Sequence, residues 1–298
     1  MSIKAVAGVA RAPFLLLPVT LVAAGAAAAW WEGDFSWLRT LVALVGLVSL
    51  HIAVNAFNEV SDFKSGIDLE TERTPFSGGS GTLPSGVLNP VVGTRLGASA
   101  AFIGLVAGYW FLSLVGWKLL PILVIGGLAI LAYTDFLARH YVGEFFAGLG
   151  LGAMPVLGTA MVQGGHIGPA AVVAAVPAFF MTFNLLLLNE FPDEEADRAG
   201  GRRNLVLLLG RTGAARVYGM CALFVPVWLV GAFLLGFIPA LSLAAAASSL
   251  LLVKPLRWAF LSPEREVPIP ALGANVIWNL ATNTLLALSL VAAGWMRG

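Results

Sequence analysis

Apolar stretches of about twenty residues recur along this chain of 298 residues and constrain its fold more than any other feature. A helix of roughly 20 residues crosses the apolar core of a bilayer, so each stretch is long enough to span a membrane. Backbone groups in lipid must pair within their own segment, which favours helices. The strands of a membrane barrel would alternate apolar and polar residues, and these stretches do not. The sequence therefore predicts an all-α membrane protein.

Nine transmembrane helices are expected. They cover residues of about 12–31, 39–62, 91–115, 119–138, 142–163, 168–191, 213–236, 238–260 and 269–296. The first stretch follows Lys4 and Arg11 and resembles a signal peptide. It is long for the apolar region of such a peptide, and we interpret it as a retained helix. Cys221 is the only cysteine, which excludes a disulfide within the chain and a cysteine-based metal site.

Positive charge lies almost entirely on one side of the expected topology. All Lys and Arg residues except Arg39, Lys118 and Arg297 fall on the side of the N-terminus. Because Lys and Arg are enriched in cytoplasmic loops, we expect a cytoplasmic N-terminus, an external C-terminus and the inner membrane of a prokaryote. The lipid bilayer is then the surrounding partner, and no nucleic-acid partner is expected.

The ends of the second and sixth expected helices carry the same pattern. Asn58 and Asp62 end the second helix, and Asn189 and Asp193 end the sixth, with the same separation in both pairs. An even number of spans separates the copies, so both come from the same membrane face. The candidate site is therefore expected to open to the cytoplasm.

This repeat also predicts the domain organisation. The chain is expected to form a single domain with two parallel halves around a central cavity, which is unlike the inverted repeats of many transporters. The boundaries are residues 1–298 for the domain, about 12–138 and 142–260 for the halves, and 269–296 for a final helix.

The repeated clusters offer oxygen ligands typical of a divalent-metal site. Carboxylate and amide oxygens suit Mg²⁺, above all where a phosphate supplies further ligands. Residues four apart share one face of a helix, so the Asn and Asp of each copy point the same way. Asp62 and Asp193 are the candidate catalytic residues, and Mn²⁺ is expected to substitute for Mg²⁺. The candidate metal ligands are Asn58, Asp62, Asp68, Asn189, Asp193 and Asp197.

Basic residues follow the clusters and predict the binding of a diphosphate. A guanidinium group matches two phosphate oxygens at once. The candidates are Arg73, Arg139, Arg202 and Arg203. The alternative is that such arginines only set the membrane orientation, and we favour this alternative for Arg211 and Arg216.

Three other polar residues are candidates for contact with a second substrate, the acceptor. His51 and Asn55 lie on the same helical stripe as Asp62 but deeper, and Arg11 lies at the mouth of the first helix. A structural role is the alternative for each, as a buried hydrogen-bonded side chain or as an anchor. The Gly- and Ser-rich segment 77–86 is open to three interpretations, namely an anion-binding nest, a lid or a plain loop.

Together these motifs resemble those of the UbiA superfamily of intramembrane aromatic prenyltransferases. Asn58, Asp62 and Asp68 match the first family motif, Asn-x₃-Asp-x₃₋₅-Asp, and Asp193 and Asp197 match the second, Asp-x₃-Asp. The resemblance implies nine membrane helices and Mg²⁺-dependent transfer of a polyprenyl group from its diphosphate to an aromatic acceptor. The wide spacing from Asp62 to Asp68 resembles the 1,4-dihydroxy-2-naphthoate (menaquinone) branch more than the hydroxybenzoate branch.

Other functions stay open at this point. Family members that use a chlorophyll, haem or glycerol-lipid acceptor share the same motifs. A transporter for a divalent ion or an anion also contains repeats and membrane carboxylates. Against transport, the carboxylates lie at one membrane face and the two copies are parallel. The sequence does not define the acceptor, the prenyl length or the oligomeric state.

Overall fold

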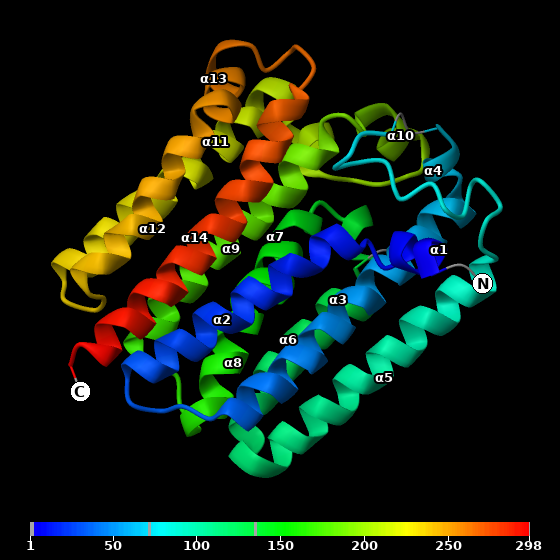
Figure 1. Ribbon diagram of the computed structural model, residues 1–298. Coiled ribbons are helices and arrows are strands. Elements are labelled where there is room, and N and C mark those ends of the chain that lie inside the picture. The colour runs from blue at the N-terminus through cyan, green and yellow to red at the C-terminus, as the bar shows by residue number, and fades with distance from the viewer. Residues whose placement is uncertain (1–2, 71–72, 134–135, 298) are drawn as a thin grey trace.

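The computed structural model describes residues 3–70, 73–133 and 136–297, except for the side chain of Glu70. Every regular element in these ranges is a helix, and they contain no β-strand. The long helices run in similar directions and form one elongated bundle, with the two termini at opposite ends (Figure 1). The expected all-α membrane fold is therefore confirmed.

Eight helical runs in the described residues are long and apolar enough to cross a membrane. Three of them are composite. The five simple runs are α3 (Trp37–Ser65), α5 (Pro90–Val115), α9 (Pro169–Glu190), α11 (Leu205–Leu234) and α14 (Ile269–Trp295). The first composite run joins η1 (Ala12–Leu15) to α2 (Leu16–Trp31), and the second joins α7 (Gly143–Gly148), the π-helical η4 (Leu149–Ala153) and α8 (Met154–Gly164). The third joins η5 (Ala240–Ser242), α12 (Leu243–Ala247), η6 (Ser248–Leu252) and α13 (Val253–Leu261).

The fourth expected helix, at about 119–138, is shorter than the sequence suggests. Its apolar run consists of η2 (Trp117–Leu119) and α6 (Leu120–Leu131), and the chain then turns into η3 (Leu137–Arg139). The Leu137 and Ala138 N–H groups donate to the Ala132 and Tyr133 carbonyls at 2.9 and 2.8 Å. These two bonds span five residues, one more than in an α-helix, so the chain follows a wider turn after α6.

The seventh expected helix, at about 213–236, begins eight residues earlier, at Leu205 in α11. Asn204 caps it, because its side-chain oxygen accepts a hydrogen bond from the Leu207 N–H at 3.0 Å. The helix is kinked at Gly210, whose φ of 68° is left-handed and suits glycine. Because α11 begins early, only a short segment connects it to α10 (Glu194–Ala199).

Small residues dominate the centre of the bundle. Helix α2 packs against α8, α9 and α14 through an alanine-rich surface. At Gly25 an added Cβ would lie 2.4 Å from the Val156 carbonyl oxygen, so α2 and α8 approach as closely as glycine allows.

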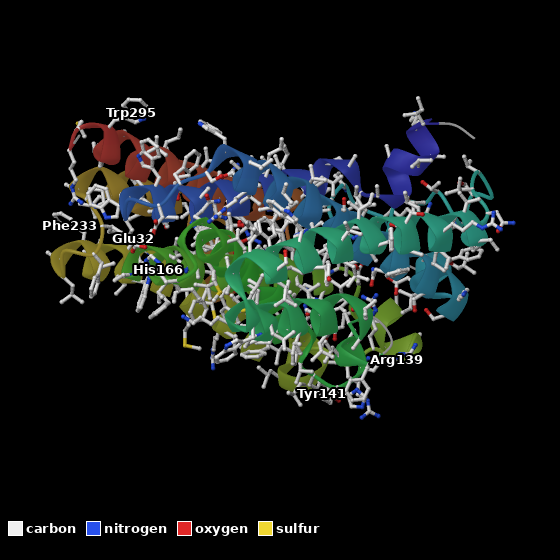
Figure 2. All side chains as sticks on the ribbon, turned by 90° about the horizontal axis from the view of Figure 1, so that it is seen from below. Glu32, Arg139, Tyr141, His166, Phe233 and Trp295 are labelled. Atoms are coloured by element: carbon white, nitrogen blue, oxygen red, sulfur yellow. The ribbon has the colours of Figure 1, made fainter. Side chains whose placement is uncertain are left out.

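Three short helices gather at one end of the bundle, which is also the end that holds Arg139 and Tyr141 (Figures 1 and 2). They are α1 (Ile3–Val9), α4 (Ile67–Glu70) and α10 (Glu194–Ala199). Helices α4 and α10 pack on each other, although they are far apart in the sequence. Glu32, His166 and Trp295 lie at the opposite end (Figure 2).

Candidate active site

A cavity of about 180 Å³ lies where the ends of α3 and α9 meet the short helices α4 and α10. It is lined by polar groups near these ends and by apolar side chains deeper in the bundle. All six candidate metal ligands line this one cavity. The structure therefore brings the two acidic motifs together.

The first motif is built from the last turns of α3 and the short helix that follows. The Asn58 Nδ2 donates a hydrogen bond to Asp62 Oδ2 at 2.8 Å, which is the contact expected of residues four apart on a helix. The helix ends at Gly66, whose φ of 84° is left-handed. This turn starts α4 and returns Asp68 to the cavity beside Asp62.

The second motif follows the end of α9. Asn189 lines the cavity from the last turn of α9, and Asp193 begins α10. The Asp197 N–H donates to the Asp193 carbonyl at 2.8 Å, which stacks the two aspartates one turn apart. Asn204 Nδ2 donates to Asp197 Oδ2 at 2.9 Å, so the cap of α11 also orients the last aspartate.

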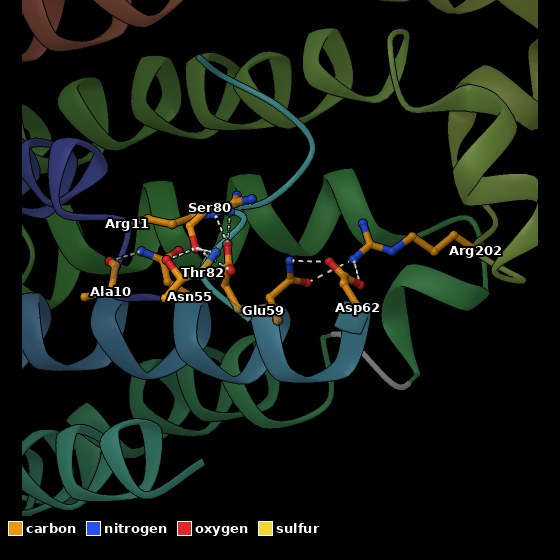
Figure 3. Close-up of polar contacts among 9 residues, drawn as sticks. Ala10, Arg11, Asn55, Glu59, Asp62, Ser80, Thr82 and Arg202 are labelled. Carbon is orange, nitrogen blue, oxygen red and sulfur yellow. Dashed lines mark hydrogen bonds and ion pairs between the residues drawn. The ribbon is translucent and has the colours of Figure 1, made fainter. Parts of the chain in front are cut away.

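Arg202 lies between the two motifs. Its Nη2 donates hydrogen bonds to Asp62 Oδ1 and, at 3.1 Å, to Asn58 Oδ1 (Figure 3). Its Nη1 lies 3.7 Å from Asp197 Oδ1, and the side chain is 15% exposed. One buried guanidinium thus links a carboxylate of each motif and partly balances their charge.

The donor set fits Mg²⁺ when a phosphate completes the coordination. Among the described residues, the buried atoms Asp68 Oδ2, Asp193 Oδ1 and Asp197 Oδ1 have no hydrogen-bond partner. In the described part of the chain, no three acidic, imidazole or thiol groups converge closely enough to hold a metal ion alone. Mg²⁺ in proteins is commonly bound by one or two carboxylates together with substrate phosphates, and this arrangement suits that mode.

The electrostatics of the site favour a bound cation. Burial, together with the nearby Asp62 carboxylate, raises the pKa of Asp68 to about 7. Burial also raises the pKa of Asp197 to about 7 and that of Asp193 to about 6, against the opposing effect of the Arg202 guanidinium. A divalent ion would stabilise the ionised carboxylates and displace their protons.

The other candidate diphosphate ligands do not line the cavity. The Arg73 Nη2 donates to the Asp68 carbonyl at 3.4 Å, and its guanidinium packs against Gly81. Arg139 lies near Gly201 at the mouth. Arg203 is exposed, and its guanidinium lies 5.9 Å from the centre of the Tyr141 ring. Of the four predicted arginines, only Arg202 reaches the cavity.

The candidate acceptor residues Arg11, His51 and Asn55 all line the cavity. Arg11 Nε donates to Glu59 Oε1 at 3.0 Å, and Asn55 Nδ2 donates to the Ala10 carbonyl at 3.0 Å (Figure 3). The His51 Nδ1 lies 3.0 Å from the carbonyl oxygen of Leu47.

Glu59, to which the sequence pattern gives no role, holds the glycine-rich segment in place. Glu59 is 1% exposed, and its carboxylate accepts hydrogen bonds from the Ser80 N–H at 2.6 Å and the Ser80 hydroxyl at 2.8 Å (Figure 3). The segment thereby covers Asp68: a Cβ at Gly79, whose φ is 71°, would lie 2.6 Å from Asp68 Oδ1. The only local signal was the position of Glu59 beside Asn58.

A second unassigned pair, Glu144 and Glu190, lies on the inner side of the motifs. Glu144 Oε1 accepts a hydrogen bond from the Leu205 N–H at 2.6 Å, and Glu190 lines the cavity from the last residue of α9. The Glu144 contact ties α7 to the start of α11. It helps to position the segment that carries Arg202.

The fold and this site define an intramembrane enzyme of the prenyltransferase class. Residues 16–280 match the UbiA prenyltransferase family, and the chain belongs to that family. The resemblance found in the two motifs is therefore confirmed.

The curated relatives point to one branch of the family. The 1,4-dihydroxy-2-naphthoate octaprenyltransferase of Bacillus subtilis is 29% identical over 208 residues, which cover 67% of this chain and 64% of that protein. The protein of the same name from Escherichia coli is 27% identical, over 96% of this chain and 94% of its own length.

Solved structures share the fold at low sequence identity. A UbiA homologue from Aeropyrum pernix superposes with a TM-score of 0.70 at 16% identity, over 96% of this chain and 98% of that one. A UbiA homologue from Archaeoglobus fulgidus, bound to DMAPP and Mg²⁺, gives a TM-score of 0.64 at 11% identity, over 96% and 99%.

Proposed function

We propose that this protein transfers a polyprenyl group from polyprenyl diphosphate to an aromatic quinone precursor in the membrane, with Mg²⁺ as cofactor. A dihydroxynaphthoate is the preferred acceptor, because two curated relatives carry this acceptor in their names. The observation that carries the proposal is the shared cavity, which joins two acidic motifs and a buried arginine to an apolar interior.

The polar end of the cavity is the proposed diphosphate site. Mg²⁺, once bound, would neutralise the diphosphate and make it a better leaving group. Asp62 and Asp193 are the central ligands, since each comes from a different motif. The remaining ligands are Asn58, Asp68, Asn189 and Asp197.

Arg202 is the proposed cationic partner of the leaving group. As the bond from C1 to oxygen breaks, negative charge grows on the diphosphate, and a fixed guanidinium stabilises that charge. Arg73, Arg139 and Arg203 lie further out, and we propose that they guide the diphosphate at the mouth of the cavity.

The apolar end of the cavity is the proposed reaction chamber. Its walls include Phe14, Leu17, Val54, Leu185 and Leu186. These side chains exclude water from an allylic carbon that gains cationic character, and so protect it from hydrolysis. The electron-rich aromatic carbon then attacks C1 from within this chamber. The bond from C1 to the diphosphate oxygen breaks, a carbon–carbon bond forms, and the attacked ring carbon releases its proton to restore the aromatic ring.

The site is proposed to open to the cytoplasm. The short helices and Arg139 lie at one end of the bundle (Figures 1 and 2), and the charge distribution assigns this end to the cytoplasm. Water-soluble prenyl diphosphate head groups and Mg²⁺ would enter there, while the isoprenoid chain stays in the apolar interior.

The test is prenyl transfer by the purified protein in detergent or nanodiscs. With 1,4-dihydroxy-2-naphthoate, a polyprenyl diphosphate and Mg²⁺, we expect a prenylated product, and we expect none after chelation of the metal. The variants Asp62→Ala and Asp193→Ala should fold and lose activity. Near-normal rates in either variant would contradict the two-motif site.

A further inference from the structure

His51 presents an unused hydrogen-bond acceptor to the cavity. Its side chain lies on α3, lines the cavity and is 5% exposed. Because Nδ1 lies 3.0 Å from the Leu47 carbonyl, Nδ1 carries the hydrogen of the neutral ring. Nε2 is then an acceptor, and it is buried without a partner among the described residues.

The polar neighbours of His51 are already committed to the protein. Arg11 is paired with Glu59, whose carboxylate also holds the glycine-rich segment. Asn55 donates to the carbonyl of Ala10, at the break between α1 and η1. These contacts give both side chains a structural role, whereas the His51 Nε2 has no hydrogen-bond partner in the part of the chain that the structure describes. A buried polar atom without a partner is unfavourable unless a ligand pairs with it.

The depth of His51 matches the size of an aromatic acceptor. With a rise of about 1.5 Å per residue, His51 lies roughly 10 Å along α3 from Asn58 and the diphosphate end. The prenyl C1 lies next to the diphosphate, and a reacting carbon approaches it to about 3 Å. The distance that remains between C1 and the His51 imidazole accommodates an aromatic system of one or two rings with a substituent that reaches the imidazole.

We propose that the His51 Nε2 accepts a hydrogen bond from a ring hydroxyl of the acceptor, and that this contact selects hydroxylated aromatic substrates. The inference rests on the proposed prenyl transfer and assigns the acceptor end of the same cavity. When the acceptor hydroxyl donates a hydrogen bond to the imidazole, the aromatic ring of the acceptor becomes richer in electrons. This favours attack of that ring on C1. His51 is thus a specificity residue that contacts the acceptor.

The test measures acceptor binding, so that the reactivity of the ring does not affect the result. The protein is loaded with Mg²⁺ and an unreactive geranyl thiolodiphosphate. Isothermal titration then gives the Kd of 1,4-dihydroxy-2-naphthoate, 1-hydroxy-2-naphthoate and 4-hydroxy-2-naphthoate for the wild type, His51→Leu and His51→Gln. His140→Leu is the matched control, because the His140 Nδ1 also lies close to a carbonyl four residues earlier, but the side chain is exposed.

We expect His51→Leu to weaken binding of the dihydroxy compound roughly 10- to 100-fold, as expected for a lost buried hydrogen bond. Binding of one monohydroxy compound should not change, because it lacks the hydroxyl that His51 contacts. The glutamine variant should recover part of the affinity through its amide oxygen. The control variant, and binding of the Mg²⁺ thiolodiphosphate complex to every variant, should match the wild type.

Two outcomes would overturn the inference. Equal losses for all three naphthoates would mean that His51 only shapes the pocket, and unchanged Kd values would mean that it makes no contact. Thermal melting of each variant identifies a general loss of folding, and the glutamine variant then decides the question. If His51→Leu weakens binding of the dihydroxy compound as expected but the wild type transfers no prenyl group, the proposed function is wrong and the hydroxyl contact is still supported.

Discussion

Replacing Arg202 by alanine should destabilise the protein in the absence of Mg²⁺. The guanidinium lies between Asp62 and Asp197 and also contacts Asn58, and its side chain is 15% exposed. Removal of one partner from a buried ion pair costs about 3–5 kcal/mol, because the remaining carboxylates lose their counter-charge. For a domain of this size, 1 kcal/mol corresponds to about 2–4 °C in melting temperature. The variant should therefore melt roughly 6–20 °C below the wild type.

Thermal melting in detergent, followed by intrinsic fluorescence, measures this difference. Arg203→Ala is the matched control, because the neighbouring side chain is exposed and contacts only the face of Tyr141 among its described charge and ring contacts. Its effect should stay below about 1 kcal/mol. Mg²⁺ without the diphosphate should reduce the difference in melting temperature between Arg202→Ala and the wild type, because the metal supplies positive charge to the same carboxylates.

The reasoning is refuted if Arg202→Ala and Arg203→Ala melt at the same temperature. If the difference in melting temperature between Arg202→Ala and the wild type is large but Mg²⁺ does not reduce it, the carboxylates are not metal ligands, and that part of the reasoning is refuted. Arg202→Lys should lie between the wild type and the alanine variant, because the charge returns without the two-pronged geometry of guanidinium.

Three further predictions follow from the same contacts. Since burial raises the pKa of Asp68 and Asp197 to about 7, protons compete with the metal below that pH, and the Mg²⁺ concentration for half-maximal rate should fall as the pH rises from about 6 to 8; a constant value would contradict this linkage. Glu59→Ala should speed proteolysis within residues 76–82 at least about tenfold, because two charge-assisted hydrogen bonds to Ser80 are lost, whereas Ser85→Ala should not. In a Cys221→Ser background, cysteines at Ser85 and Arg198 should react with a membrane-impermeant reagent only from the cytoplasmic side and a cysteine at His166 only from outside, and the reverse pattern would reject the topology.

The acidic motifs could be predicted from the sequence because their geometry is local. Asn58 and Asp62 are four residues apart on one helix, and the same pattern returns at Asn189 and Asp193. Helical periodicity alone therefore aligns the side chains within each motif. The division into two parallel halves stays a prediction.

The choice among the arginines could not be made from the sequence. The turn between α10 and α11 directs Arg202 into the cavity and leaves Arg203 exposed, through backbone hydrogen bonds of their N–H groups to the Asp197 and Ala138 carbonyls. The first of these bonds is local, but the second comes from a distant segment, and spacing does not reveal it. Glu59 was missed for a similar reason, because its partner Ser80 lies in a loop.

The ends of the helices could be predicted from the sequence only where a local signal marks them. Asn204 is a recognisable cap, and it explains why α11 starts before the most apolar part of its sequence. The early end of α6 is followed instead by a wide turn, in which the Leu137 and Ala138 N–H groups bond to carbonyls five residues earlier. Hydropathy measures only whether a residue tolerates lipid, so it extends such a helix too far.

Mass spectrometry of the reaction products tests the central claim most directly. The purified protein is incubated with a polyprenyl diphosphate, 1,4-dihydroxy-2-naphthoate and Mg²⁺, alongside Asp62→Ala and a sample with excess EDTA. The account predicts a naphthoate-derived product that carries the prenyl group, formed by the wild type with Mg²⁺ and absent from the other two samples. A protein that binds Mg²⁺ and the diphosphate but forms no prenylated aromatic product would contradict the claim, as would undiminished product formation by Asp62→Ala.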